Sequence, residues 1–431
     1  MSPHDSATPQ IPAIQVPGSN ESMVRSGGLI RMLWDESYGG RSGYDRHGPR
    51  RRINRPVRKQ VGPHATRMPL PPLCCRLLVF NRWIPNVNSK RQREKVTFSY
   101  DGTGPESGNL CLLNGTCAFV VSDSAPSDEL RARMPSLWHL PVLAGAVAIV
   151  FNLPDLVDLE LRIPRETLAA IFLGRIRRWS ELARWNPKLE GVNESIALVV
   201  RSDESATTEA LTSALSSFSS EWKGKVGTSS RPKWPGFAIR TEGDSGVALQ
   251  LLRLPYSLGY MPLTNTFKVS TAFIENDAGH FVAPSTNSVQ AAMDDAVGKG
   301  FEEMGSRTKV LFLSIVDRKN TSDAYPIARL SYMAFEARAL DCLTLEFVVY
   351  LLYWAWTDRR AAEIALQLSF APISSGIRHS LLSLLQTLSC YAHDANETKQ
   401  MSTQISNSMT ILERVKYSIS PIVMGAGASS P

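Results

Sequence analysis

The sequence predicts an α/β fold built mostly from parallel β-sheets. From about residue 70 onward, segments typical of strands alternate with segments typical of helices, as they do in parallel sheets with connecting helices. Residues 146–153 (AVAIVFNL) are apolar on both faces, which is typical of strands in such sheets. With 431 residues, 43% of them hydrophobic, the chain has room for two or three domains and a sizeable core.

Each predicted element rests on the spacing of its apolar residues. In residues 165–185, Leu168, Ile171, Phe172 and Ile176 share one helical face, with Arg175 and Arg178 opposite. Residues 195–200 (SIALVV) form a predicted strand that leads directly into a polar stretch. Helices are predicted at residues 73–83, 165–185, 246–253 and 344–356, and strands at residues 95–100, 117–123, 146–153, 195–200 and 257–263.

The composition of residues 1–65 predicts a disordered basic arm. They are rich in Pro, Gly, Ser and Arg and show little apolar periodicity. The net charge of +7 has one source here, since residues 41–59 hold eight Lys or Arg against Asp45 alone. A solvated arm is one interpretation, and nucleic-acid or membrane-surface binding is another. No aromatic residue follows Tyr44 in this cluster, which disfavours nucleic acid.

The six cysteines show no paired spacing of the kind that marks a zinc site, so we expect no metal and no other cofactor. Cys111 and Cys117 form either a short disulfide loop or two buried thiols. Sequons usable in a secretory compartment occur at Asn114, Asn193, Asn320 and Asn396.

Export and membrane signals are weak. Residues 1–30 lack the pattern of a signal peptide, so either the protein is not secreted as it stands or the true start is missing. The longest apolar runs, residues 140–154 and 342–356, are too short for a spanning helix, and Glu346 interrupts the second. We therefore expect no transmembrane segment.

The polar stretch RSDESAT, residues 201–207, lies between the strand that ends at Val200 and a helix predicted to start near Thr208. Open α/β sheets bind ligands at the carboxyl ends of their strands. Free N–H groups and the macrodipole at a helix N-terminus favour anions, and an arginine grips two oxygens at once. The alternative is that Ser205 or Thr207 only caps the helix while Arg201 pairs with Asp203 on the surface.

The motifs around this stretch decide between the two interpretations. RSDESAT matches, at all positions but one, the signature Arg-Ser-Asp-x-Ser-Gly-Thr of the phosphate-binding proteins of the periplasmic substrate-binding superfamily, which the chain resembles. The resemblance runs from about Val96 to Cys390 and implies a two-lobed, type II fold, each lobe a mostly parallel sheet flanked by helices, with a hinge of crossover strands. Further matches, in the family's order, are FVVSDSAPSDEL, LPVLAGAVAIVFNLP, LAAIFLGRIRRWSELARWNP, SEWKGKVG with KWP, EGDSGVA, SLGYM and AYPI.

The resemblance assigns roles to individual residues. It implies that phosphate is held by the guanidinium, hydroxyl and N–H groups of Arg201, Ser205, Ala206 and Thr207. Asp203, two residues after Arg201, is placed to orient its guanidinium. It also implies that Asp123 accepts a hydrogen bond from the protonated anion. A buried carboxylate beside an anion is tolerable only if the anion brings a proton, as phosphate does and sulfate does not. Rejection of sulfate is expected to follow.

The chain departs from the family pattern in two of the loops. Ala206 replaces a glycine, and its methyl group intrudes where the anion would approach. The loop DGTGPESGN, residues 101–109, carries an apparent insertion, so Thr103 is the expected hydroxyl ligand and Ser107 the alternative.

The first family loop is not recognisable in ATRMPLPPLCC, residues 65–75. Residues 419–431, with Gly425, Gly427 and Ser429, look like that missing loop. We therefore read residues 66–395 as the binding domain and 396–431 as a tail. Three interpretations of the tail remain open. It is the start of a second repeat, or it supplies Ser429 to the chain's own binding site as in a circular permutant, or it is a flexible end.

The leading functional hypothesis is a phosphate-binding module for uptake or sensing, without catalysis. Its partners would be inorganic phosphate and a membrane permease or receptor, and we expect a monomer. The resemblance implies a location outside the cell. The main alternative is a degenerate domain that no longer binds phosphate and serves as an interaction or structural domain. A phosphate-ester hydrolase is a weaker one, because His139 and His280 have no Ser or Asp partner at motif spacing and are expected at the surface or in packing.

Overall fold

The computed structural model describes residues 65–66, 75–90, 97–98, 105–156, 158–266, 269–297, 302–303, 309–316, 322–388 and 412. All the described residues belong to one of the two units of the chain, the second unit, which spans residues 61–431. The predicted domain at residues 66–395 lies in this second unit. Apart from Ala65 and Leu412, the predicted arm and tail lie outside the described residues.

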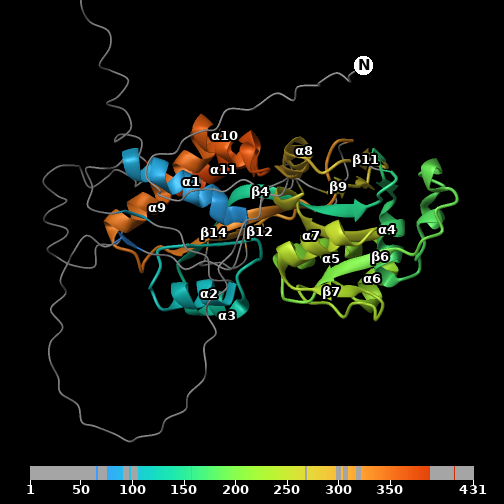
Figure 1. Ribbon diagram of the computed structural model, residues 1–431. Helices are drawn as coiled ribbons and strands as arrows, with labels where there is room; N and C mark the ends of the chain where they lie inside the picture. Colours follow the sequence, from blue (N-terminus) through green and yellow to red (C-terminus); the bar gives the residue numbers. More distant parts are fainter. Residues whose placement is uncertain are drawn as a thin grey trace, which may run out of the picture. The chain divides into compact units, whose positions relative to one another are not determined.

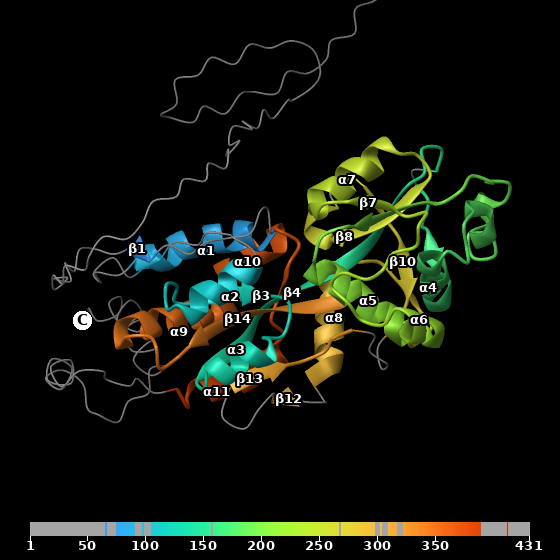
Figure 2. The same cartoon turned by 90° about the horizontal axis from the view of Figure 1, so that it is seen from below.

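The second unit has the expected α/β class, with its helices and strands in two lobes (Figures 1 and 2). The first lobe contains α1 (Cys75–Lys90), α2 (Pro105–Leu113), β3 (Val120–Ser122), α3 (Asp128–Arg133), α8 (Thr286–Val297), β12 (Glu302–Glu303), β13 (Lys309–Phe312), β14 (Ala328–Glu336), α9 (Cys342–Thr357), α10 (Arg359–Gln367), β15 (Ala371–Pro372) and α11 (Ser375–Leu385). The second lobe contains β5 (Arg162–Ile163), α4 (Arg165–Leu173), β6 (Ala197–Arg201), α5 (Ala206–Phe218), α6 (Ser220–Lys225), β7 (Ile239–Thr241), α7 (Gly243–Arg253), β8 (Ser257–Pro262), β9 (Ser270–Thr271), β10 (Phe273–Glu275) and β11 (Phe281–Val282).

Strand β4 (Leu137–Asn152) runs through both lobes (Figure 2). Its first half pairs with β13, β14 and β15 of the first lobe, and its second half pairs with β8 and β9 of the second. All but its last residue are buried, because elements of both lobes cover it. It is therefore a crossover strand of the kind that the resemblance implies. The short strands β1 (Ala65–Thr66) and β2 (Thr97–Phe98) form a separate parallel pair.

The expectation that residues 146–153 form a parallel strand is wrong. Over this stretch β4 pairs antiparallel with β8, from Val147 with Pro262 to Asn152 with Ser257. It is parallel only to β13, among the strands that the structure describes, and that pairing is confined to its beginning. The apolar pattern is correct about burial on both faces, but burial does not report strand direction.

Parallel pairing does prevail where β6 lies between β7 and β8. Because these strands run in the same direction, the carboxyl ends of β6 and β7 meet at one edge of the sheet. Helix α5 begins five residues after β6 ends, and α7 begins two residues after β7 ends. Two helix N-termini therefore lie at the same edge.

The predicted helix at residues 165–185 is shorter than expected. Leu168, Ile171 and Phe172 are buried on one face of α4, as predicted, but the helix ends before Gly174. Gly174 has φ +75°, and a Cβ there would clash with the ring of Phe237. Glycine is required for this left-handed C-cap, so the apolar spacing at Ile176 belongs to the next segment. The 3₁₀ helices are Trp179–Leu182, Pro187–Leu189 and Leu263–Asn265.

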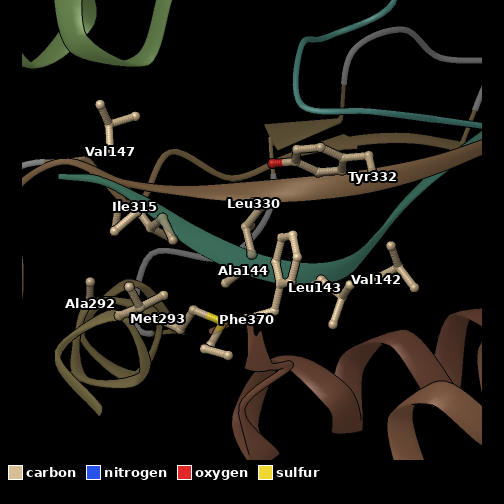
Figure 3. Close-up of a cluster of buried hydrophobic side chains, with 14 of the residues drawn as sticks. Val142, Leu143, Ala144, Val147, Ala292, Met293, Ile315, Leu330, Tyr332 and Phe370 are labelled. Atoms are coloured by element: carbon tan, nitrogen blue, oxygen red, sulfur yellow. The ribbon is translucent and has the colours of Figure 1, made fainter. Parts of the chain in front are cut away.

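The core follows β4 through the molecule. In the first lobe, Leu143 and Ala144 of β4 share one buried cluster with Met293 of α8 and with Phe370 of the segment before β15 (Figure 3). In the second lobe a smaller cluster joins β4, β6 and β8 to α7. Its members are Ala148, Val150, Val199, Val247, Leu251 and Met261.

Cys111 and Cys117 form a disulfide, with their Cα atoms 5.5 Å apart, which confirms the first of the two interpretations of this pair. The bond closes the turn that follows α2, where Gly115 has φ +62°. The sequon residues Asn114 and Asn193 are exposed, and Asn320 and Asn396 lie outside the described residues. None of the described helices is long and apolar enough to cross a membrane.

Candidate functional site

Helix α5 begins at Ala206, two residues before the predicted position, because Ser205 is its N-cap. The Ser205 backbone is extended, and its Oγ accepts hydrogen bonds from the N–H groups of Thr207 at 3.1 Å and Thr208 at 3.5 Å. The N–H of Ala206 has no hydrogen-bond partner among the described residues. This N–H and the positive end of the helix dipole are the features that anions use at helix N-termini.

Arg201 is a buried residue that ends β6, five residues before α5 begins. Its Nε donates to Oδ1 of Asp203 at 2.7 Å, its Nη2 donates to Oδ2 of the same carboxylate, and its Nη1 donates to Asp244. Burial alone lowers the pKa of Arg201, but the two carboxylates outweigh it and raise the pKa. The guanidinium is therefore charged, and three of its five N–H groups are occupied, leaving two.

The two carboxylates that bind Arg201 have pKa values shifted in opposite directions. Burial raises the pKa of Asp203, but the hydrogen bond from Arg201 and the N–H of Gly243 outweigh it, so the pKa lies below its usual value. Asp244, in the first turn of α7, is more deeply buried, and desolvation outweighs the charges of Arg201 and Arg329. The pKa of Asp244 is therefore raised.

Two aromatic residues hold Arg201 in position. Trp234 donates its Nε1–H to the carbonyl of Arg201 at 2.8 Å. The hydroxyl of Tyr260, on β8, accepts from the N–H of Arg201 at 3.2 Å and lies 2.7 Å from Oγ1 of Thr208. Burial raises the pKa of Tyr260, so this hydroxyl stays protonated. These contacts tie the end of β6 to the start of α5.

Asp123 lies in the first lobe, directly after β3, with its side chain 2% exposed. Ser331 donates its hydroxyl to Oδ1 at 2.6 Å, and Nη1 of Arg329 lies 2.7 Å from Oδ2. Both partners come from β14, which pairs with β3. The carboxylate is therefore buried beside a cation and a hydroxyl donor.

The structure brings the two predicted halves of the site close together. Ser124, next to Asp123, donates its hydroxyl to Oε2 of Glu209 on α5 at 2.6 Å. Arg329, the ion-pair partner of Asp123, also lowers the pKa of Asp244, the partner of Arg201. Thr103 lies outside the described residues, and its alternative Ser107 is a residue of α2.

The sequence interpretation missed two charged residues at this site. Asp244 lies in the matched motif EGDSGVA but received no role, although an acid just before the helix predicted at residues 246–253 is a visible signal. Arg329 is an arginine inside the largely apolar segment ARLSYMAF of a buried strand, which is the pattern that marks a charge with a partner.

The predictions for the two histidines are confirmed. His139 is buried and stacks on Tyr332, with ring centroids 4.3 Å apart, and burial lowers its pKa to about 4. His280 is exposed in the turn between β10 and β11. Among the described residues, no group of three or more His, Cys, Asp or Glu side chains is arranged to hold a metal ion.

Two α/β lobes that share a long crossover strand, with charged groups from both lobes brought together, define a two-lobed binding protein. The model of the PBP superfamily domain matches residues 78–350, and the chain belongs to this superfamily. It is 29% identical over 313 residues to the phosphate-binding protein PstS of Haemophilus influenzae, covering 72% of this chain and 89% of the relative.

Two further comparisons match this chain to a viral protein and to a solved structure. A putative serine/threonine-protein kinase/receptor of Acanthamoeba polyphaga mimivirus is 26% identical over 333 residues, which cover 72% of this chain and 19% of that protein. The fold also matches the structure of a high affinity periplasmic phosphate-binding protein bound with phosphate, at a TM-score of 0.56 and 16% identity. That match covers 77% of this chain and 97% of the other.

Proposed function

We propose that the protein binds inorganic phosphate, without catalysis, between Asp123 of the first lobe and Arg201 of the second. One observation carries the proposal: Arg201 is buried and ends β6 five residues before α5 begins, and the first N–H group of α5, that of Ala206, has no partner among the described residues. Membership of the PBP superfamily and similarity to named phosphate-binding proteins support the choice of anion.

The donors for phosphate come from three kinds of group. Arg201 has two N–H groups beyond those that its carboxylate partners occupy. Ser205 uses its oxygen as an acceptor for the helix N-cap, which leaves its O–H as a donor. The N–H of Ala206 is the third, and Thr207 is held next to it in the first turn of α5.

Asp123 is the proposed acceptor for a proton of the bound anion, opposite the donors on α5. As a phosphate-binding module, the protein would work with a membrane permease or a receptor domain, in phosphate uptake or in phosphate sensing. The Cys111–Cys117 disulfide supports an oxidising location, because such bonds persist mainly outside the cytosol.

A second candidate function is an interaction domain that no longer binds phosphate. The observation in its favour is that Asp203 and Asp244 both occupy Arg201, so an incoming dianion faces two carboxylates. Repulsion of this kind weakens anion binding unless a proton or a further cation compensates.

Titration calorimetry with inorganic phosphate on the full chain distinguishes the two functions. We expect heat of binding from the wild-type protein and a loss of affinity of about a hundredfold in Arg201→Lys, because lysine cannot reproduce the planar fork of donors. Arg175→Lys is the matched control, since Arg175 pairs with Glu221 on the surface of the same lobe. A folded wild-type protein that shows no binding would favour the interaction domain.

A further inference from the structure

Arg329 is a charged residue on a strand whose other residues are largely apolar and buried. It lies on β14 opposite Gly145 of β4, and its side chain is 14% exposed. Within the described part of the chain, the ion pair with Asp123 is its one direct polar side-chain contact. The side chain therefore retains N–H groups on Nε and Nη2 beyond the nitrogen that faces Asp123.

The pairing changes what Asp123 can do as a selector. An unpaired buried carboxylate repels any anion that brings no proton, which is the physical basis for accepting phosphate and rejecting sulfate. Here Asp123 lies 2.7 Å from a guanidinium and accepts a hydrogen bond from Ser331 at 2.6 Å. The negative charge of Asp123 is compensated before any ligand arrives, so the penalty for an anion without a proton is reduced.

Arg329 also acts on a carboxylate of the second lobe. Its charge favours the ionised form of Asp244, the carboxylate that binds Nη1 of Arg201, so both guanidinium groups interact electrostatically with one carboxylate. Their remaining N–H groups, one set from each lobe, are suited to the oxygens of a tetrahedral anion. A second guanidinium also compensates part of the charge that Asp203 and Asp244 place near Arg201.

We propose that Arg329 is a specificity-determining residue that makes the site accept fully deprotonated tetrahedral dianions, such as sulfate, in addition to phosphate. This inference rests on the proposed function, because it concerns the same site. It differs from the selectivity that the family signature implies, since Asp123 no longer presents an uncompensated charge.

The test is titration calorimetry of the full chain with phosphate and with sulfate at equal ionic strength. We expect the wild-type dissociation constants for the two anions to agree within about tenfold. In Arg329→Gln, phosphate binding should fall by no more than about tenfold, whereas sulfate binding should fall by about a hundredfold or more, because Asp123 is then uncompensated. Arg359→Gln is the matched control, since it removes the same charge from the exposed surface of α10.

Two further variants keep the test decisive if Arg329→Gln folds poorly. Arg329→Lys retains the charge and should retain sulfate binding. Asp123→Asn combined with Arg329→Gln removes both charges and should restore sulfate binding relative to Arg329→Gln alone.

Each contrary outcome has a distinct meaning. A wild-type protein that binds phosphate and rejects sulfate overturns this inference and leaves the proposed function intact. Sulfate binding that is unchanged in Arg329→Gln overturns the role of Arg329. A folded wild-type protein that binds neither anion overturns the proposed function, and the inference with it.

Discussion

Arg201 donates a hydrogen bond from Nη1 to Asp244, a residue 43 positions further along the chain. The pair forms because β6 and β7 run parallel, so that the last residue of β6 lies beside the first turn of the helix that follows β7. It joins the signature stretch RSDESAT to a second motif, EGDSGVA, and places a buried carboxylate within the proposed anion site.

Replacement of this carboxylate should strengthen phosphate binding. Asp244→Asn keeps the size of the side chain, removes one negative charge, and leaves Nη1 of Arg201 more available to the anion. We expect the dissociation constant to fall by about tenfold, measured by calorimetry at neutral pH. Asp277→Asn is the matched control, because Asp277 forms an ion pair with Arg165 elsewhere in the second lobe. Weaker binding in Asp244→Asn would show that the carboxylate supports the site by orienting Arg201.

The raised pKa of Asp244 predicts a pH dependence of stability. A carboxyl group whose pKa is higher in the folded state contributes stability that is fully present below its unfolded pKa and is lost as the pH rises through the folded value. Asp203, whose pKa is lowered, acts in the opposite direction and only at more acidic pH.

Urea unfolding from about pH 4 to about pH 7 tests this dependence. The free energy of unfolding of the wild-type protein, minus that of Asp244→Asn, should decrease as the pH rises. A difference that stays constant over this range would contradict the raised pKa.

Ser205 should affect both stability and binding. Ser205→Ala removes the N-cap of α5 and one donor to phosphate, so we expect a stability loss of about 1 kcal/mol. Phosphate affinity should fall by about tenfold or more, since a hydrogen bond to a charged group is lost. Ser219→Ala is the matched control, because Ser219 caps α6 in the same way through the N–H of Trp222. The control should lose stability alone, and equal losses of affinity in both variants would remove Ser205 from the site.

Ala206→Gly tests whether the methyl group restricts the anion. Ala206 is the first residue of α5, where glycine allows the backbone N–H to approach a ligand more closely. We expect tighter phosphate binding by calorimetry, together with a loss of stability of up to about 1 kcal/mol. Unchanged affinity, with phosphate still bound, would mean that the methyl group does not obstruct the site.

The Cys111–Cys117 disulfide should stabilise the first lobe without contributing to binding. The bond spans a sequence separation of 6 residues. For such a short loop, the lost entropy of the unfolded chain corresponds to about 2 kcal/mol. The double variant Cys111→Ser with Cys117→Ser should lose about this amount in urea unfolding and keep its phosphate affinity. A double variant is preferable to a reducing agent, because Cys342 is also disulfide-bonded.

The resemblance to a known family supplied the expectation of crossover strands. The sequence by itself determined the α/β class, the main helices and the stretch that carries Arg201 and Ser205. These depend on local patterns, namely apolar spacing, burial on both faces, and polar groups where a strand meets a helix. The helix start was misplaced by two residues because Ser205, Thr207 and Thr208 are all suitable caps, and only the hydrogen bonds of the folded chain choose Ser205. The break at Gly174 was missed because the close approach of Phe237, which excludes a Cβ there, comes from a distant segment.

Only the tertiary structure decided the direction of β4 and the partners of the charged residues. Strand direction depends on which strands pair, and β4 pairs antiparallel with strands that lie far from it in the sequence. The pairs Asp123–Arg329 and Arg201–Asp244 join residues from different parts of the chain, so no local pattern could predict them. The electrostatic balance of the site depends on those long-range pairs, because a carboxylate acts differently when a guanidinium lies beside it.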